Sequence, residues 1–259
     1  MSASLPSAFL GHGSPMHALG EDAVTRAWAE FGRSVQPRAV LVVSAHWCTR
    51  GTAATAMVQP RTIHDFHGFP RELYAVRYPA PGSPELARRA LARLHDHAGG
   101  RVAEDHGFGL DHGAWSVLLH VFPEASIPVV QVSLDLAQPM EWHLEAGRLL
   151  RPLRDEGVLV LGSGNVVHNL GDLDPDEGAP MPAAGRRFRD HVEQVLAAGD
   201  DAALAAWRSH PDAAYAAPTV EHFLPLLWVA GARRPGEPLR VLADGPAHRG
   251  ISMFSCAFG

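Results

Sequence analysis

Residues 39–47, Ala-Val-Leu-Val-Val-Ser-Ala-His-Trp, decide the fold predicted for this chain of 259 residues. Pro37 precedes the run of branched apolar residues, and small residues close it. Such a pattern is typical of a strand that is buried on both faces of a sheet. The strand delivers His46 at the point where it ends, so the stretch predicts both a core element and a candidate functional residue.

Two other stretches repeat this arrangement. Residues 8–10 run into Gly11-His12-Gly13, and residues 157–161 run into a Gly- and Ser-containing turn that ends at His168. In open α/β sheets, ligands bind in the crevice beyond the carboxyl ends of the strands. We therefore expect His12, His46 and His168 to meet at one edge of a sheet, where a metal ion is the ligand that best accounts for them.

Composition limits the classes of protein that need to be considered. Hydrophobic residues make up 46% of the chain, which is enough for a sizeable core, and the net charge is −6. No basic stripe is present, so we expect no nucleic-acid partner. No run of about 18 apolar residues occurs and the first residues do not resemble a secretory signal, so we expect a cytoplasmic protein without a membrane span. All 22 basic residues are arginines, and Cys48 and Cys256 are too few for a disulfide framework.

Strand and helix patterns alternate along the chain without a repeat or a linker. We therefore expect one α/β domain over residues 1–259, with a central, mostly parallel or mixed sheet and helices on both faces. Strands are expected at residues 8–10, 39–46, 52–58, 127–133, 157–161, 239–243 and 251–258. Helices are expected at residues 23–31 (capped by Asp22), 85–95 (with Ser83 near its start), 115–122, 139–154, 188–198, 202–207 and 219–230.

The histidines differ in how strongly their surroundings indicate a metal site. Zinc and iron(II) both accept neutral imidazole, but the chain has no HExxH pair and no CxxC, so local spacing alone is a weak signal. The clear strands before His12 and His46 make these two the best ligand candidates. His168 comes next, together with His222, which lies one turn into the expected helix 219–230 beside Glu221.

Other residues have weaker indications. His64 and His112 lie in polar, Gly-rich loops and could line a pocket. Gly162-Ser163-Gly164 is neither a GxSxG elbow nor a P-loop, and nothing marks Cys48 as a nucleophile. We expect eight other histidines to be structural or solvated: His17, His95, His97, His120, His143, His191, His210 and His248.

Seven short motifs, spread in order over nearly the whole chain, resemble the class III (LigB-type) extradiol ring-cleavage dioxygenases, in particular the DOPA 4,5-dioxygenase branch. The resemblance implies a single α/β domain with a mononuclear metal site. The matching stretches are residues 11–16 (GHGSPM), 43–47 (VSAHW), 62–66 (TIHDF), 78–82 (YPAPG), 111–115 (DHGAW), 162–169 (GSGNVVHN) and 218–222 (PTVEH).

The resemblance also implies roles for individual residues. His12, His46 and His222 would correspond to the metal ligands, and His168 to the acid/base histidine or a fourth ligand. His112 would be a catalytic histidine of the substrate pocket, where His64 is a second candidate for contacting the substrate. Many class III enzymes complete the site with a carboxylate, so Glu221 stays open as the third ligand.

The implied reaction opens the ring of a DOPA-like catechol beside its diol. One divalent ion, Fe2+ for oxygenase activity or Zn2+ as bound, would hold the small aromatic diol and O2 together. A histidine that titrates near neutral pH could take the second hydroxyl proton and later return it. The product would be a muconic semialdehyde.

Two alternatives from other classes stay open. A zinc hydrolase could use the same histidines, with His168 as the base. A non-catalytic binding protein is the other, because the related Memo proteins keep this fold while serving in signalling. Arg61, Arg71 and Arg77 could anchor a substrate carboxylate, although exposed, solvated arginines are the more common case. The sequence carries no signal for an oligomeric state.

Overall fold

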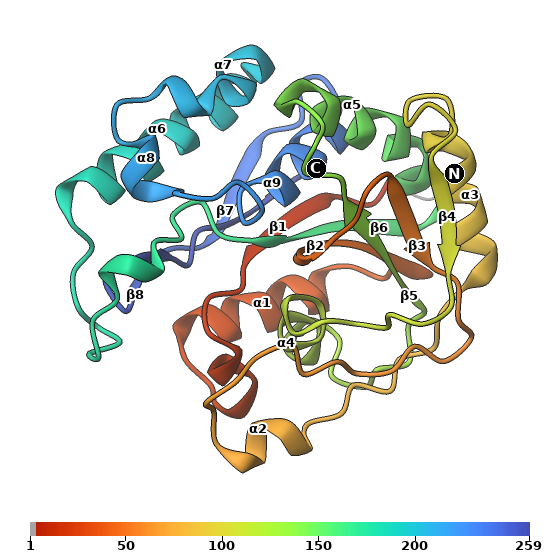
Figure 1. Ribbon diagram of the computed structural model, residues 1–259, viewed down its shortest axis with the longest axis horizontal. Helices are drawn as coiled ribbons and strands as arrows, with labels where there is room; N and C mark the ends of the chain where they lie inside the picture. The colour runs from red at the N-terminus through yellow and green to blue at the C-terminus, as the bar shows by residue number, and fades with distance from the viewer. Residues whose placement is uncertain (1–3) are drawn as a thin grey trace.

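The computed structural model describes residues 4–259 as a mixed sheet between two layers of helices (Figure 1). The eight strands lie in the order β4-β3-β5-β2-β6-β1-β10-β7. Their bounds are β1 (Ser7–Gly11), β2 (Ala39–Cys48), β3 (Thr52–Thr55), β4 (Val102–Asp105), β5 (Val129–Leu134), β6 (Val158–Gly164), β7 (Leu239–Ala243) and β10 (Ser255–Phe258). The central strands β5, β2, β6 and β1 run parallel, and β10 pairs antiparallel with both β1 and β7. The expected α/β fold with a mixed sheet is confirmed.

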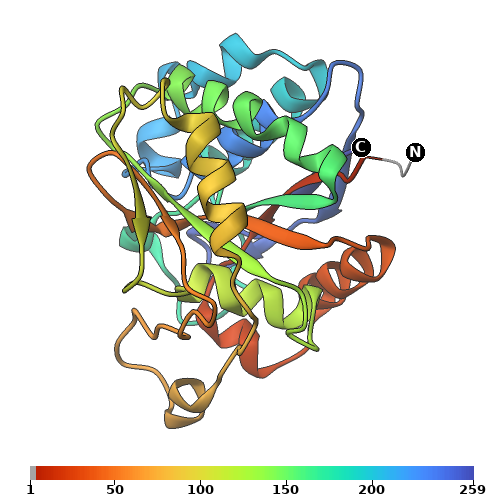
Figure 2. The same ribbon diagram turned by 90° about the vertical axis from the view of Figure 1, so that its right-hand side faces the viewer.

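Helices cover both faces of this sheet (Figures 1 and 2). One face carries α1 (Ala23–Ser34) and α4 (His112–Val121), with α2 (Arg71–Ala75) beyond them. The other face carries α3 (Pro84–Leu94), α5 (Met140–Leu150) and α9 (Leu224–Ala232). Three further helices lie on that same side: α6 (Ala183–Ala198), α7 (Asp201–Ala205) and α8 (Ala213–Ala216). The 3-10 helices are η1 (Pro15–Leu19), η2 (Arg151–Glu156), η3 (Leu170–Asp172) and η4 (Trp207–Ser209).

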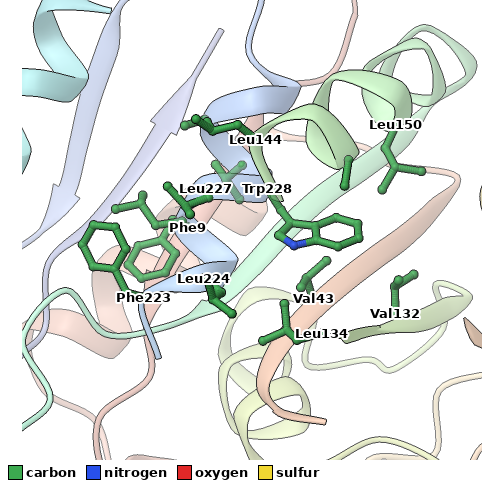
Figure 3. Packing of buried hydrophobic residues seen from close by; sticks show 14 of the residues in the cluster. Phe9, Val43, Val132, Leu134, Leu144, Leu150, Phe223, Leu224, Leu227 and Trp228 are labelled. Atoms are coloured by element: carbon green, nitrogen blue, oxygen red, sulfur yellow. The ribbon is translucent and has the colours of Figure 1, made fainter. Parts of the chain in front are cut away.

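Strand β2 shows why its sequence is apolar throughout. Successive side chains of a strand point to opposite faces. Val40 and Val42 join the core beneath α1 and α4, whereas Leu41 and Val43 join the core beneath α5 and α9, and all four are fully buried. Figure 3 shows the second core, in which Trp228 of α9 lies among side chains from the sheet and from α5. Burial on both faces fixes β2, and therefore the position of His46 at its end.

The structure confirms several predicted elements and corrects others. The Asp22 and Ser83 side chains cap α1 and α3 as expected, by accepting hydrogen bonds from Thr25 N and Leu86 N. The predicted strand 251–258 is divided, because β9 (Ile251–Ser252) pairs with β8 (Pro246–Ala247) and only β10 joins the main sheet. β4 was not predicted; its residues are partly exposed at the edge of the sheet, where an apolar pattern is not required.

Two helix starts near the candidate site were predicted wrongly. α4 begins at His112, three residues earlier than expected, because the Asp111 side chain accepts a hydrogen bond from Ala114 N and caps the helix there. His112 is therefore a helical residue and not a loop residue. α9 begins at Leu224, so His222 lies in the turn before the helix. The helices within residues 4–259 are too short or too polar to traverse a lipid bilayer.

Helices α5 and α9 approach each other closely through two glycines. A Cβ atom on Gly147 would lie 2.0 Å from the Trp228 carbonyl oxygen, and a Cβ on Gly231 would lie 1.9 Å from the Leu144 carbonyl oxygen. Neither position has room for a methyl group, and the obstructing atoms belong to the backbone. The two glycines therefore set the distance between the helices that cover the centre of the sheet.

Replacing Gly231 by Ala should lower the free energy of unfolding by about 3 kcal/mol, because the added methyl group forces α5 and α9 apart. Urea denaturation followed by tryptophan fluorescence measures this change. Gly107→Ala is the matched control, since an added Cβ meets no atom within 4 Å there, and its effect should stay within about 0.5 kcal/mol. Equal stabilities of the two variants would contradict the close helix contact.

A buried histidine between these two helices makes the stability of the fold depend on pH. His143 of α5 is fully buried, and its Nδ1 accepts a hydrogen bond of 3.0 Å from Trp228 Nε1 of α9. Burial lowers the pKa of His143 from 6.5 to about 4, with Asp135 opposing and His97 adding to the shift. The folded protein thus keeps this ring neutral at pH values at which the unfolded chain protonates it. Stability from this residue is complete above pH 6.5 and is lost as the pH falls toward 4.

The His143→Asn variant should be less sensitive to acid than the wild type, because Asn can accept the Trp228 hydrogen bond without taking a proton. Between pH 6.5 and 4, the difference between the two free energies of unfolding should change by up to about 1.4 kcal/mol per pH unit. Urea titrations at a series of pH values provide the comparison. Parallel pH profiles for the two proteins would show that the ring is not held neutral by the fold.

Candidate functional site

The ends of β1, β2 and β6 place the first two candidate ligands together. β6 pairs in parallel with both neighbours, with Gly11 opposite Gly164 and Ser44 opposite Ser163. His12 and His46 therefore emerge at the same edge of the sheet, as the sequence predicted. Their Nε2 atoms are 3.0 Å apart.

His222 reaches this edge through the turn that precedes α9. Its carbonyl oxygen accepts a hydrogen bond of 2.9 Å from Asn165 N, at the end of β6. A Cβ atom on Gly164 would lie 2.2 Å from the same oxygen, so only glycine permits this approach. The His222 carbonyl is thus bonded to the segment that follows β6, and α9 begins two residues later, at Leu224. One nitrogen from each of His12, His46 and His222 lies within 4.8 Å of the other two.

The hydrogen bonds behind two of these rings fix where their protons lie. The Ser163 hydroxyl donates to the Gly113 carbonyl oxygen (2.6 Å), so its oxygen accepts a hydrogen bond from Nδ1–H of His12 (3.0 Å). Nδ1 of His222 lies 3.2 Å from Oε1 of Glu221 and donates to it. In both rings the Nε2 lone pair is then free. Nε2 of His222 is buried and has no partner within the described part of the chain.

This donor set fits a metal ion. Buried polar atoms normally have a hydrogen-bond partner, and an orphaned imidazole nitrogen that faces two others requires an explanation. A divalent cation accepts lone pairs from all three nitrogens at once, and neutral His is its most common protein ligand. Glu221 lies behind His222, and its Oε1 also accepts a hydrogen bond from the Thr219 hydroxyl (2.6 Å). His222 and not Glu221 therefore lines the cavity.

Burial keeps the three rings neutral. It lowers the pKa of His12 and of His46 well below 6.5, and the neighbouring histidines add to the effect. Burial also lowers the pKa of His222, although the Glu221 carboxylate opposes the shift. The pKa of Glu221 is lowered to about 2, because hydrogen bonds from His222 and Thr219 outweigh burial. The lone pairs are thus available to a metal ion at neutral pH.

The three rings form part of the wall of a cavity of about 560 Å³. His112 and His168 belong to the same wall, and most of the remaining lining is apolar. The His168 ring stacks on the His222 ring with 3.4 Å between centroids and 9° between planes. Burial, and then His222, lower the pKa of His168 to about 3. The other lining residues are Gly13, Ser14, Pro15, Phe66, Phe69, Leu170, Leu173, Asp174, Pro175, His248 and Ile251.

Asp65 connects two of the site histidines. Its Oδ1 accepts a hydrogen bond of 2.9 Å from the His112 backbone N–H at the start of α4. Its Oδ2 lies 3.0 Å from Nδ1 of His112, where the groups are poorly aligned for a hydrogen bond, and 3.8 Å from Nδ1 of His46. Burial alone would raise the pKa of Asp65, but His112 lowers it. The result is a carboxylate that holds α4 and His112 against the cavity.

Two histidines do not lie where the sequence placed them. His64, expected to contact the substrate, does not line the cavity: its Nε2 donates to the Val76 carbonyl oxygen (3.1 Å), and its ring packs near Phe66. His248, expected to be structural or solvated, does line the cavity, and its Nδ1 donates to the Asp174 carbonyl oxygen (3.0 Å). Both differences arise in loops, whose paths are set by backbone hydrogen bonds that the sequence does not display.

Sequence reasoning did not assign roles to Asp65 and Ser163. Both lie inside motifs that were recognised, TIHDF and GSGNVVHN. Asp65 is adjacent to His64 in the same polar loop, and a polar residue beside a candidate histidine is a signal for a partner of a ring nitrogen. Ser163 lies beside no candidate histidine, and its partner His12 is 151 residues away in the chain, so the sequence carried no comparable signal for it.

Comparison with known proteins agrees with this geometry. Residues 7–259 match the family described as the catalytic LigB subunit of aromatic ring-opening dioxygenase. The chain is 44% identical to 4,5-DOPA dioxygenase extradiol of Escherichia coli (strain K12), covering 100% of this chain and 96% of that protein. It is 39% identical to 4,5-DOPA dioxygenase extradiol of Beta vulgaris, covering 86% and 85%. A crystal structure of an uncharacterized protein from Escherichia coli K12 matches with a TM-score of 0.84 and 40% identity, covering 98% and 100%.

These matches extend over almost the whole chain, so they include every element that supplies a cavity histidine. They confirm the resemblance drawn from the seven motifs and favour a ring-opening enzyme over a zinc hydrolase or a Memo-like binding protein. The chain belongs to the LigB family of aromatic ring-opening dioxygenases.

Proposed function

We propose that this enzyme opens the ring of a catechol beside its diol, using O2 and one divalent metal ion held by His12, His46 and His222. The observation that carries the proposal is the group of three imidazole nitrogens within 4.8 Å of one another in the wall of a largely apolar cavity. Fe2+ is the ion we propose for the reaction, because zinc has no redox chemistry. Since all three histidines meet at one edge of a single sheet, we infer that the chain acts as one catalytic domain.

A bound iron(II) ion would supply neighbouring open positions at which a catechol and dioxygen are held together, which removes the entropic cost of their encounter. The protein prepares this site in advance. Ser163 and Glu221 accept hydrogen bonds from Nδ1–H of His12 and of His222, which leaves both Nε2 lone pairs free for the ion. Second partners of this kind orient ligands and raise their basicity.

His168 is the residue we propose as the acid/base. Burial beside His222 lowers its pKa to about 3, below the near-neutral value that the sequence predicted, so the ring is neutral and its lone pair is free to face a catechol hydroxyl. A bound metal ion would lower the pKa of that hydroxyl, which would let this weak base take its proton. His168 lies outside the group of three close nitrogens, which favours the acid/base role over a fourth ligand position. The proton would be returned as the ring opens.

His112 is the residue we propose to hydrogen-bond the bound substrate. Asp65 fixes the backbone of His112 at the start of α4, and the ring stands beside His46, with 3.9 Å between ring centroids. Phe66 flanks His112 with 5.6 Å between centroids and gives the aromatic ring of a catechol an apolar surface. His64 could act only indirectly, by supporting Phe66, because it does not line the cavity.

Alanine at His12, His46 or His222 should reduce metal affinity by about 100-fold or more, because each change removes a proposed ligand. Ser163→Ala should reduce it by about tenfold, since the His12 ring loses its orienting partner. Metal content after loading with Fe2+ or Zn2+ and dialysis, determined by mass spectrometry, measures both effects. His95→Ala, at an exposed position, is the control. Near-stoichiometric metal in His46→Ala would refute the assignment of His46 as a metal ligand.

Protein loaded anaerobically with Fe2+ should consume one O2 per catechol and release a ring-opened semialdehyde. Zinc-loaded protein should consume none. His168→Ala should retain the metal but lose about 100-fold or more in kcat, as expected for the loss of an acid/base. An oxygen electrode and metal analysis on the same samples separate the two effects. Absence of O2 uptake with every catechol tested would refute ring opening and revive the hydrolase alternative.

A further inference from the structure

A fully buried carboxylate close to the site has no part in the proposed reaction. Asp111 has no exposed surface, and no ion pair within residues 4–259 includes it. Burial, with Asp65 adding to the effect, raises the pKa of Asp111 to about 6, and hydrogen bonds from Ser44 and Gln131 limit the shift. The group is therefore a carboxylate at neutral pH, which can only accept hydrogen bonds. Because burying a charge is costly unless it is hydrogen-bonded, its partners show what the group does.

The hydrogen bonds of Asp111 join a helix to two strands. Its Oδ1 accepts from Ala114 N (3.0 Å), which caps α4, and from the Ser44 hydroxyl (2.7 Å) near the end of β2. Its Oδ2 accepts from Nε2 of Gln131 on β5, and Oε1 of Gln131 accepts from Asp111 N (3.3 Å). Strands β2 and β5 are neighbours in the sheet. One carboxylate thus holds the first turn of α4 against both.

The bond to Ser44 leads directly to a proposed metal ligand. Ser44 Oγ accepts a hydrogen bond of 3.3 Å from His46 N, and its own proton goes to Asp111. Gly113 shows how closely α4 lies on the end of β2. A Cβ atom on Gly113 would lie 2.5 Å from Ser44 Oγ and 2.9 Å from Cδ2 of His46. The backbone of the ligand and the start of the helix are therefore held in contact by one chain of hydrogen bonds.

The same turn of α4 carries two other groups of the site. His112 is proposed to contact the substrate, and its ring centroid lies 3.9 Å from that of His46. The Gly113 carbonyl oxygen accepts the hydrogen bond of the Ser163 hydroxyl, which leaves the serine oxygen to accept from His12. A shift of this turn would change the distance between His46 and His112 and would also disturb the partner of His12.

We propose that Asp111 is a positioning residue of this enzyme, which fixes the first turn of α4 against β2 and β5. It does not line the cavity, so it acts through the rings whose spacing this turn determines. A misplacement of about 1 Å can cost about 100-fold in rate, so a small shift of the turn weakens turnover as well as metal binding. The effect on turnover rests on the proposed ring opening, whereas the effect on metal binding can be measured without it.

A buried, hydrogen-bonded carboxylate can also serve the stability of the fold alone, and the two roles differ in what they predict. A change at a residue that only stabilises lowers the free energy of unfolding but leaves the properties of the folded enzyme as they were. A change at a positioning residue alters Zn2+ affinity and kcat/KM at temperatures at which the variant is fully folded. Circular dichroism identifies those temperatures for each variant.

Asp111→Asn tests the proposal with little change in shape. The new side-chain oxygen can still accept from Ser44 and Ala114, but the new amide group faces the amide group of Gln131, where one acceptor is then lacking. We expect Zn2+ affinity, measured by competition with a chromogenic chelator, and kcat/KM of Fe2+-loaded protein for DOPA to fall about tenfold each. Ser116→Ala is the matched control, because the Ser116 hydroxyl is buried in α4 without a hydrogen-bond partner within residues 4–259. Both quantities should keep their wild-type values in the control.

Adding Gln131→Glu to Asp111→Asn should reverse the loss. The new carboxylate at position 131 accepts from the amide group and from the backbone N–H of residue 111, so every hydrogen bond is restored and one buried negative charge is kept. Zn2+ affinity and kcat/KM of this double variant should return to within about threefold of the wild type, as expected for two residues in direct contact. A folded double variant that does not recover would refute the role assigned to these hydrogen bonds.

Ser44→Ala provides a second test that is independent of the helix cap. It removes the link to β2 and leaves the bonds of Asp111 to Ala114 and Gln131 in place, so it decides the question if Asp111→Asn does not fold. We expect a loss of Zn2+ affinity of about tenfold here too. Wild-type Zn2+ affinity and kcat/KM in the folded variants, whatever their stability, would overturn the positioning role and leave ring opening intact. If the wild type opens no catechol, ring opening fails, and the Zn2+ affinities alone decide the role of Asp111.

Discussion

Parallel pairing of β6 with both β1 and β2 is the constraint on which the site depends. It sets Gly11 opposite Gly164 and Ser44 opposite Ser163, so the chain segments that leave these strands are held at one edge. The absence of a side chain at Gly164 then lets the His222 carbonyl approach the end of β6. Backbone geometry therefore brings together three imidazoles from distant parts of the sequence.

The supporting groups decide what these rings can do. The hydroxyl of Ser163 must donate to the Gly113 carbonyl oxygen, which leaves its lone pair for Nδ1 of His12. Because a neutral imidazole carries one proton, fixing it on Nδ1 leaves Nε2 as a base or a ligand. Glu221 does the same for His222, so its carboxylate contributes to the site without entering it. A carboxylate next to a histidine in the sequence can thus serve as a partner of that ring and not as a third ligand.

The sequence predicted the features that depend on long buried strands. The apolar run 39–43 and the Gly-flanked His12 were sufficient for the α/β fold and for two of the converging rings, because parallel strands expose their carboxyl ends at a common edge. It failed where one hydrogen bond decides the backbone path. The Asp111 cap moves His112 into α4, and the bond between Asn165 N and His222 O keeps His222 out of α9. The positions of His64 and His248 in their loops depend on hydrogen bonds to carbonyl oxygens 12 and 74 residues away in the chain, which the local sequence does not reveal.

Burial has the same physical effect on each histidine of the site. Removing a ring from water disfavours its charged form, so a proton competes less well than a metal ion for the lone pairs of His12 and His46. The same effect keeps the His168 ring neutral, with its lone pair free. The same effect makes any charge that lacks a partner costly to bury in the cavity.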